Sequence, residues 1–177
     1  MATSTHNILT PAGLSKAVCA VMASAYGIYY ALTAQEWHLI DNVDLVIHEA
    51  GHLIFSPFGM FIYILGGSLF QVLFPCIYVA YFYYKKSPYS ASIILFWVGI
   101  STINVSVYAA DAVRMQLPLL GGDSTIHDWH YLLDTLHLLS YTDTIGRSID
   151  TFGICIILLA IGGSIYFAFV PKAPVNA

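Results

Sequence analysis

Residues 60–84 read MFIYILGGSLFQVLFPCIYVAYFYY, an apolar run in which no side chain is charged. A helix needs about 20 mostly apolar residues to cross the roughly 30 Å hydrocarbon core of a bilayer, and this run is long enough. Lys85-Lys86-Ser87-Pro88 ends it, and a second apolar run extends from residue 89 to about residue 110. The two runs predict a pair of membrane-spanning helices joined by a short basic turn.

The composition of the whole chain also indicates a membrane protein. Of its 177 residues, 58% are hydrophobic and only 9% are charged, whereas soluble domains have about 25% charged residues. The net charge is −4, and the few basic residues are scattered, so the chain lacks the basic patch of a nucleic-acid-binding protein. The three cysteines lie far apart in apolar runs and form no CxxC pair, so we interpret them as packing residues. These features exclude a soluble domain and nucleic-acid partners.

Two further apolar segments complete the predicted architecture. We expect an all-α fold, a polytopic membrane protein in which residues 1–177 form a single membrane domain within the lipid bilayer. Its four transmembrane helices are predicted at about residues 17–34, 60–84, 89–110 and 151–170. Residues 43–55 are too short to span, and Pro57 and Gly59 interrupt any continuation, so they predict a short or re-entrant helix. Residues 127–139 have the spacing of an interfacial amphipathic helix.

Acidic side chains and histidines concentrate in two segments of the chain. All ten Asp and Glu residues lie within residues 36–52 and 111–150, as do six of the seven histidines, whereas the lysines lie in neither segment. Under the positive-inside rule the lysine ends face the cytoplasm, and both acidic segments then meet on the non-cytoplasmic side. Arg114 and Arg147 are exceptions, because they are basic residues within the second acidic segment. The predicted orientation of the chain in the membrane is reversed if residues 43–55 cross the bilayer.

His48-Glu49-Ala50-Gly51-His52 is an HExxH sequence. On a helix, histidines at i and i+4 share one face, so both imidazoles can bind one Zn²⁺ while the glutamate accepts a proton from water that the metal activates. Charged side chains beside or within apolar helices are costly and are tolerated mainly where they serve a function. We therefore predict zinc ligation by His48 and His52, with Glu49 as the catalytic base. The competing interpretation, polar residues at the wet end of a helix, leaves Glu49 without a role.

The stretch from Asp44 to about Leu73 resembles the site-2 protease family of intramembrane zinc metalloproteases. The HExxH helix is followed by a glycine-containing turn and then by the pair Gly66-Gly67, where that family has a glycine-rich stretch. Residues 117–123 (LPLLGGD) are similar to the family's Leu-Asp-Gly segment, whose aspartate is the third zinc ligand, although here Asp123 follows the glycines. The resemblance implies a small helical membrane core with zinc inside the bilayer and peptide-bond hydrolysis as the activity.

A catalytic zinc site needs a third protein ligand, and the first candidate is Asp111. Asn104, Tyr108 and Asp111 stand at i, i+4 and i+7, so three polar groups line one face of the predicted helix and point toward a partner helix. An ordinary ion pair between Asp111 and Arg114 is the alternative interpretation.

His127 and Asp128 are the second candidates for the third ligand. They begin the predicted amphipathic helix, where an imidazole or a carboxylate could turn back toward the HExxH helix. A neutral histidine whose other nitrogen is oriented by a carboxylate is a common arrangement around metals. A solvated helix face is the alternative for His127, and Asp123 is more typical of a turn.

Three classes of function agree with these residues. The first is a zinc-dependent hydrolase, above all a peptidase that cleaves membrane segments or short peptides. The second is a histidine-ligated iron enzyme, such as a lipid oxygenase or desaturase, although a glutamate inside HExxH is better explained by hydrolysis. The third is a non-catalytic subunit that assembles with other membrane subunits, with a structural metal or none.

Overall fold

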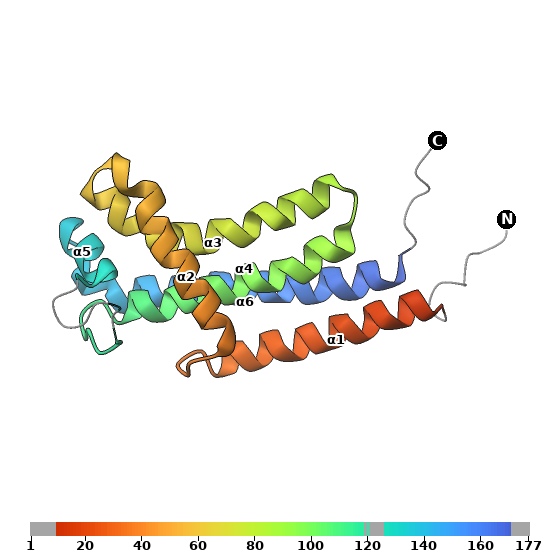
Figure 1. Ribbon diagram of the computed structural model, residues 1–177. Coiled ribbons are helices and arrows are strands. Elements are labelled where there is room, and N and C mark those ends of the chain that lie inside the picture. The colour runs from red at the N-terminus through yellow and green to blue at the C-terminus, as the bar shows by residue number, and fades with distance from the viewer. Residues whose placement is uncertain (1–9, 119, 121–125, 171–177) are drawn as a thin grey trace.

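The structure, a computed structural model, describes residues 10–118, 120 and 126–170. Its elements are α1 (Pro11–Leu32), α2 (Leu39–Phe55), a 3₁₀ turn (Ser56–Phe58), α3 (Met60–Tyr84), α4 (Pro88–Ala110), α5 (Asp128–Thr135), a second 3₁₀ turn (Leu139–Tyr141) and α6 (Thr142–Phe169). None of the described residues forms a strand, so the all-α prediction is confirmed. Figure 1 shows α1, α3, α4 and α6 lying alongside one another, with α2 crossing them at a steep angle.

Three helical segments are long and apolar enough to cross a membrane: Met60–Tyr84, Pro88–Ala110 and Leu139–Phe169. They correspond to three of the four predicted spans, and α1 is not among them. The helix α1 is rich in alanine, glycine, serine and tyrosine, so its mean hydropathy is lower than that of the other three. A multi-pass membrane protein is thus supported by three helices, and the fourth span is not established by length and composition.

Helix boundaries extend beyond the apolar runs because polar groups cap them. The helix α1 begins at Pro11, ahead of the predicted start, since Oγ1 of Thr10 accepts a hydrogen bond from the Gly13 N–H (3.1 Å). The helix α2 begins at Leu39 because Asp41 accepts from the His38 N–H (2.6 Å). The first turns of α6 are polar, so the hydropathy pattern predicted only the later part of this helix, from about residue 151.

The core of the bundle lies where α1, α4 and α6 meet. Its buried residues are Tyr30, Phe96, Ile100, Ile103, Ile157 and Ala160. Gly99 on α4 and Gly153 on α6 face each other there, and a Cβ added at either would lie 3.1–3.2 Å from the carbonyl oxygen of the other. These glycines therefore allow the two backbones to approach closely.

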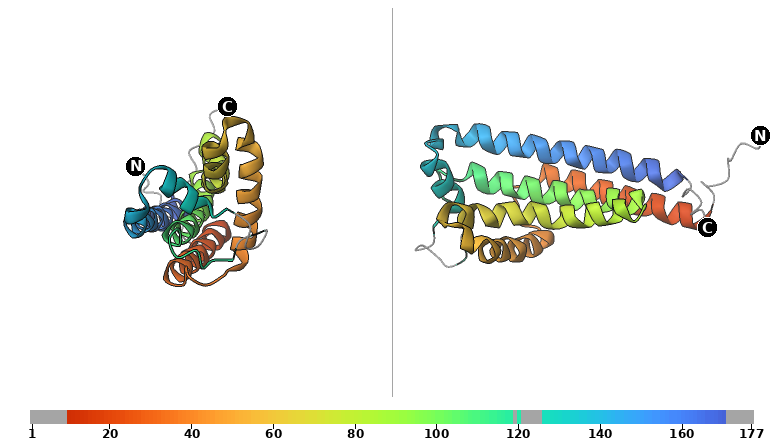
Figure 2. Two further views of the ribbon diagram at one scale, coloured as in Figure 1. Left: turned by 90° about the vertical axis from the view of Figure 1, so that its left-hand side faces the viewer. Right: turned by 90° about the horizontal axis from the view of Figure 1, so that it is seen from above.

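Glycines also hold α2 tightly against α3. A Cβ at Gly66 would lie 2.9 Å from the carbonyl oxygen of Gly51, and a Cβ at Gly51 would collide with the carbonyl oxygen of Gly66. Gly59, with φ of 88°, makes the sharp connection between the two helices, a conformation that glycine adopts without strain. In Figure 2, α2 and α5 lie at the same end of the bundle, away from the α3–α4 turn. The close packing fixes the face that α2 presents to α3.

Candidate metal centre

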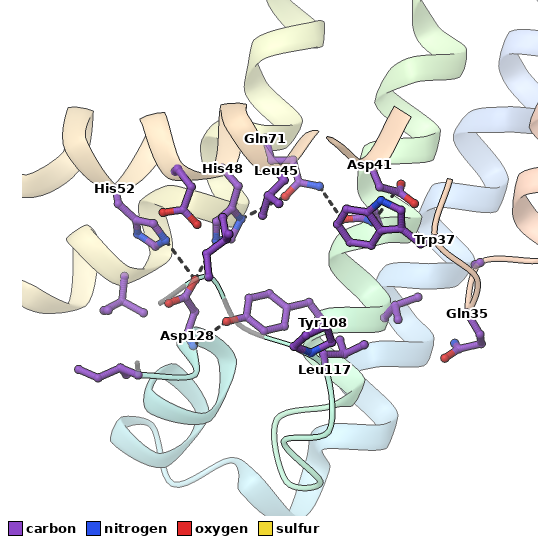
Figure 3. Close-up of a pocket in the computed structure, with 18 of the residues that line it drawn as sticks. Gln35, Trp37, Asp41, Leu45, His48, His52, Gln71, Tyr108, Leu117 and Asp128 are labelled. Atoms are coloured by element: carbon purple, nitrogen blue, oxygen red, sulfur yellow. Dashed lines mark hydrogen bonds and ion pairs between the residues drawn. The ribbon is translucent and has the colours of Figure 1, made fainter. Parts of the chain in front are cut away.

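Three side chains from two distant segments converge at one end of the bundle. His48 and His52 lie one turn apart on α2, and Asp128 begins α5 (Figure 3). Oδ2 of Asp128 lies 2.9 Å from Nε2 of His48 and 3.2 Å from Nε2 of His52. All three side chains are buried. Among the described residues they form a group whose ligand atoms lie within 4.8 Å of one another.

The hydrogen bonds of the two imidazoles determine which ring nitrogens are free. Nδ1 of His48 lies 3.1 Å from Oε1 of Gln71, and Nδ1 of His52 lies 2.8 Å from the carbonyl oxygen of Tyr63. Carbonyl oxygens only accept, so each Nδ1 must carry the proton and donate it. In the neutral imidazoles, both Nε2 lone pairs then face the carboxylate of Asp128. Three such electron pairs repel one another unless a proton or a metal cation lies between them.

The spacing of these atoms fits a small divalent metal. Zinc bonds of about 2.0–2.1 Å in a tetrahedron place the ligand atoms roughly 3.3 Å apart, close to the 2.9 and 3.2 Å observed here. Gly67 on α3 leaves the space open, because a Cβ there would lie 2.5 Å from Nε2 of His48 and 2.6 Å from Nε2 of His52. The donor set, two imidazole nitrogens and one carboxylate oxygen, therefore fits zinc with one position left for water.

A directed chain of hydrogen bonds supports His48 from behind. Nδ1 of His48 donates to Gln71, Nε2 of Gln71 donates to Oδ1 of Asn104 (2.8 Å), and Nδ2 of Asn104 donates to Oδ1 of Asp41 (3.2 Å). The hydroxyl of Tyr30 also donates to this carboxylate oxygen (2.7 Å). Because an ionised carboxylate can only accept, Asp41 sets the direction of the whole chain and keeps the proton of His48 on Nδ1.

Contacts with α4 and α3 hold Asp128 and the start of α5 in place. The hydroxyl of Tyr108 accepts a hydrogen bond from the Asp128 N–H (3.1 Å), and the indole of Trp129 donates to Ser68 on α3 (3.0 Å). Burial opposes ionisation of Asp128, but His48 and His52, when protonated, donate to its carboxylate from Nε2 and lower its pKa below the ordinary value. The carboxylate is therefore kept in the charged form that a metal requires.

Asp111 and His127 are not brought into this group. Asp111 accepts hydrogen bonds from the backbone N–H groups of Gln116 and Leu117 and so closes the loop after α4. Nε2 of His127 lies 3.4 Å from Asp111, and burial lowers the pKa of this histidine despite the nearby carboxylate. Arg114 lies 3.7 Å from Asp143 in an exposed ion pair. Asp123, in the segment similar to the site-2 protease motif, lies outside the described residues.

Two residues that position the site were missed by sequence reasoning. The sequence pattern places Gln71 only within the apolar run 60–84 and Asp41 only within the first acidic segment. An amide inside a predicted span is itself a signal, because a polar group there needs a partner. Asp41 is 2% exposed, which its neighbours in the sequence do not reveal.

A cavity of about 660 Å³ opens beside the three converging side chains. It is lined at one end by His52 and Asp128, along its length by Leu45 and Tyr108, and at the other end by the α1–α2 connector, residues 34–37 (Figure 3). Glu49 is exposed and lines the same cavity. The cavity therefore gives a ligand access to both the metal ligands and the candidate base.

Comparison of the chain with protein-family models, with curated proteins and with solved structures finds no match.

Proposed function

We propose that this protein is a membrane-embedded zinc peptidase. The observation that carries the proposal is the convergence of two Nε2 lone pairs and one carboxylate beside a cavity that Glu49 also lines. Zinc bound there would lower the pKa of a coordinated water and polarise a substrate carbonyl. The order His-Glu-x-x-His and the resemblance to site-2 proteases favour hydrolysis over redox chemistry.

The side chains around the cavity have the groups that hydrolysis of a peptide bond needs. Glu49 takes the proton from the attacking water and then delivers it to the leaving amine. The hydroxyl of Tyr108 accepts from the Asp128 N–H, so its own proton remains available to a substrate oxygen in the cavity. Gln71 and Asn104 hold His48 in the tautomer that leaves Nε2 free.

The shape of the cavity suits an extended peptide. Its lining includes residues from the connector before α2 and His52 near the end of α2. The stretch of α2 from Leu39 to His52 covers about 20 Å at 1.5 Å per residue. About six residues of extended chain have that length. Substrates are therefore membrane segments or peptides that unwind before cleavage.

We further propose four spans, with α1 as the fourth and α2 as a re-entrant helix. The helix α1 has 22 residues, about 33 Å at 1.5 Å per residue, enough to cross the hydrocarbon core. Its exposed side chains include Leu14, Val18, Val21 and Met22, which suit contact with lipid. With four spans, the lysine-rich end faces the cytoplasm and the metal centre lies toward the other side.

The test combines metal analysis with cleavage of an unfolded probe protein, β-casein, by the purified full chain. The Glu49→Gln variant is expected to retain zinc and to lose at least about a hundredfold in cleavage rate, because only the base is removed. Asp134→Asn, which changes an exposed acid on α5 that does not line the cavity, is the matched control and should keep the rate. Equal rates for Glu49→Gln and the unaltered chain would contradict the proposal. Zinc without cleavage would favour the non-catalytic subunit, and iron would favour an oxygenase.

A further inference from the structure

A second cavity lies at the end of the bundle opposite the metal centre. It is formed where α1 begins, α3 turns into α4 and α6 ends, a region that Figures 1 and 2 show at one end of the molecule. Its volume is about 780 Å³. The polar residues that line it include Lys16, Lys86, Ser87 and Ser90. Helices that are distant in sequence therefore build this cavity together.

The positive charges at this cavity have no acidic partner. In the described part of the chain, no carboxylate lies within ion-pair distance of a lysine, since the acidic residues lie in segments 36–49 and 111–150. Lys16 is half-buried, with its ammonium 5.4 Å from the ring centre of Tyr89. The hydroxyl of Tyr89 donates to the carbonyl of Lys16 (2.7 Å) and fixes α1 against α4. The ammonium is thus positioned at the cavity without being neutralised.

The beginning of α4 adds hydrogen-bond donors to the same cavity. Ser87 precedes the helix but makes no side-chain capping bond, and Pro88 occupies the first turn. The remaining N–H groups of that turn have no partner within the helix, and the helix dipole favours negative charge there. The hydroxyls of Ser87 and Ser90 lie 3.1 Å apart. Two ammonium groups, hydroxyls and free N–H groups together match the oxygens of a phosphate.

The surroundings of the cavity indicate a lipid rather than a soluble anion. The cavity lies at the ends of three helices that can cross a membrane, which is the depth of phospholipid headgroups. Large apolar or aromatic side chains are exposed next to it on α3 and α6, among them Tyr84 (81%) and Tyr166 (62%). An acyl chain can lie along these faces while the headgroup fills the cavity.

We propose that this cavity binds the phosphate headgroup of an anionic phospholipid, with Lys16 and Lys86 as the charged contacts. Juxtamembrane lysines attract anionic lipids, and basic pockets between spanning helices are known to hold their headgroups. The site is independent of the metal centre, because the two cavities share no lining residue.

Native mass spectrometry of the full chain in detergent tests this site directly. The chain is titrated in separate arms with dioleoylphosphatidylglycerol, with dioleoylphosphatidylcholine and with inorganic phosphate. Since each lysine near an anionic lipid contributes about fivefold in affinity, the double variant Lys16→Gln/Lys86→Gln should lose phosphatidylglycerol binding by about thirtyfold. Phosphatidylcholine should bind weakly to both proteins.

Lys85 supplies the matched control, because its ammonium lies over the Tyr81 ring and it does not line the cavity. Lys85→Gln should bind phosphatidylglycerol like the unaltered chain, and so should Lys16→Arg/Lys86→Arg, which keeps both charges and guards against loss of folding. The proposal is overturned if Lys85→Gln loses as much binding as the double variant, or if the double variant binds normally. Saturation by inorganic phosphate without a preference for the lipid would also overturn it.

Discussion

Gln71 is the side chain on which the orientation of His48 depends. Its Oε1 accepts from Nδ1 of His48, and its Nε2 continues the chain toward Asp41 through Asn104. We expect Gln71→Leu to weaken zinc binding by about 10–100-fold, the usual cost of losing a partner behind a metal ligand. Competition with a chelator of known affinity measures this change. Gln35→Leu, at the exposed far end of the cavity, serves as the control and should have no effect.

Asp41 acts on His48 only through the side-chain amides of Asn104 and Gln71. Its effect should therefore appear in the tautomer of His48, that is, in which ring nitrogen carries the proton. In the metal-free chain labelled with ¹⁵N-histidine, NMR should report His48 protonated on Nδ1, and Asp41→Asn should mix the two tautomers because an amide no longer fixes the direction of the chain. Asp111→Asn changes another buried acid, which instead accepts from the backbone N–H groups of Gln116 and Leu117. An equal change in the Asp111→Asn spectrum would show that the effect is a general loss of packing.

The two adjacent glycines of α3 have different tasks. Gly66 allows α2 to approach, whereas Gly67 leaves room for the metal between His48 and His52. Gly67→Ala should therefore abolish zinc binding, because its methyl group would lie against both Nε2 atoms. Gly162→Ala on α6 is the control, because a Cβ there would meet nothing within 4 Å. This variant should keep zinc and gain about 0.5–1 kcal/mol in the free energy of unfolding, since glycine is unfavourable inside a helix. Zinc analysis and thermal unfolding compare the two variants, and normal zinc content in Gly67→Ala would refute this role.

The sequence pattern predicted where the helices lie better than it predicted which side chains meet between them. The apolar runs predicted α3 and α4 almost to the residue, and the HExxH spacing predicted that His48 and His52 share a face. The choice among Asp111, His127 and Asp128 could not be made from spacing, because it depends on how the loop after α4 folds. Asp111 accepts from the N–H groups of Gln116 and Leu117, just after α4, whereas Asp128 at the start of α5 lies against His48 of α2. Such long-range geometry has no local sequence signal.

At the scale of the whole molecule, the two ends of the bundle differ in chemistry. The candidate metal centre, α2 and α5 lie at one end, and Lys16, Lys86 and the α3–α4 turn lie at the other. This polarity, together with the three membrane-capable helices, agrees with a chain that presents each end to a different side of the membrane.

The crossing of α1 can be tested by cysteine labelling in sealed vesicles. In a chain whose native cysteines are replaced, single cysteines at Ser15 and Glu36 lie near the two ends of α1 and are exposed. A membrane-impermeant maleimide should label them from opposite sides, with Ser15→Cys on the same side as a control cysteine at Lys85. Labelling of Ser15→Cys and Glu36→Cys from one side would show that α1 does not cross.

Elemental analysis of the purified full chain tests most directly whether His48, His52 and Asp128 form a zinc site. We predict about one zinc per chain, lost in Asp128→Ala but retained in Asp111→Asn and in Asp134→Ala, which removes an exposed acid from the same helix α5. Zinc retained by Asp128→Ala, or no zinc in the unaltered chain prepared without chelators, would show that these three residues do not form a zinc site.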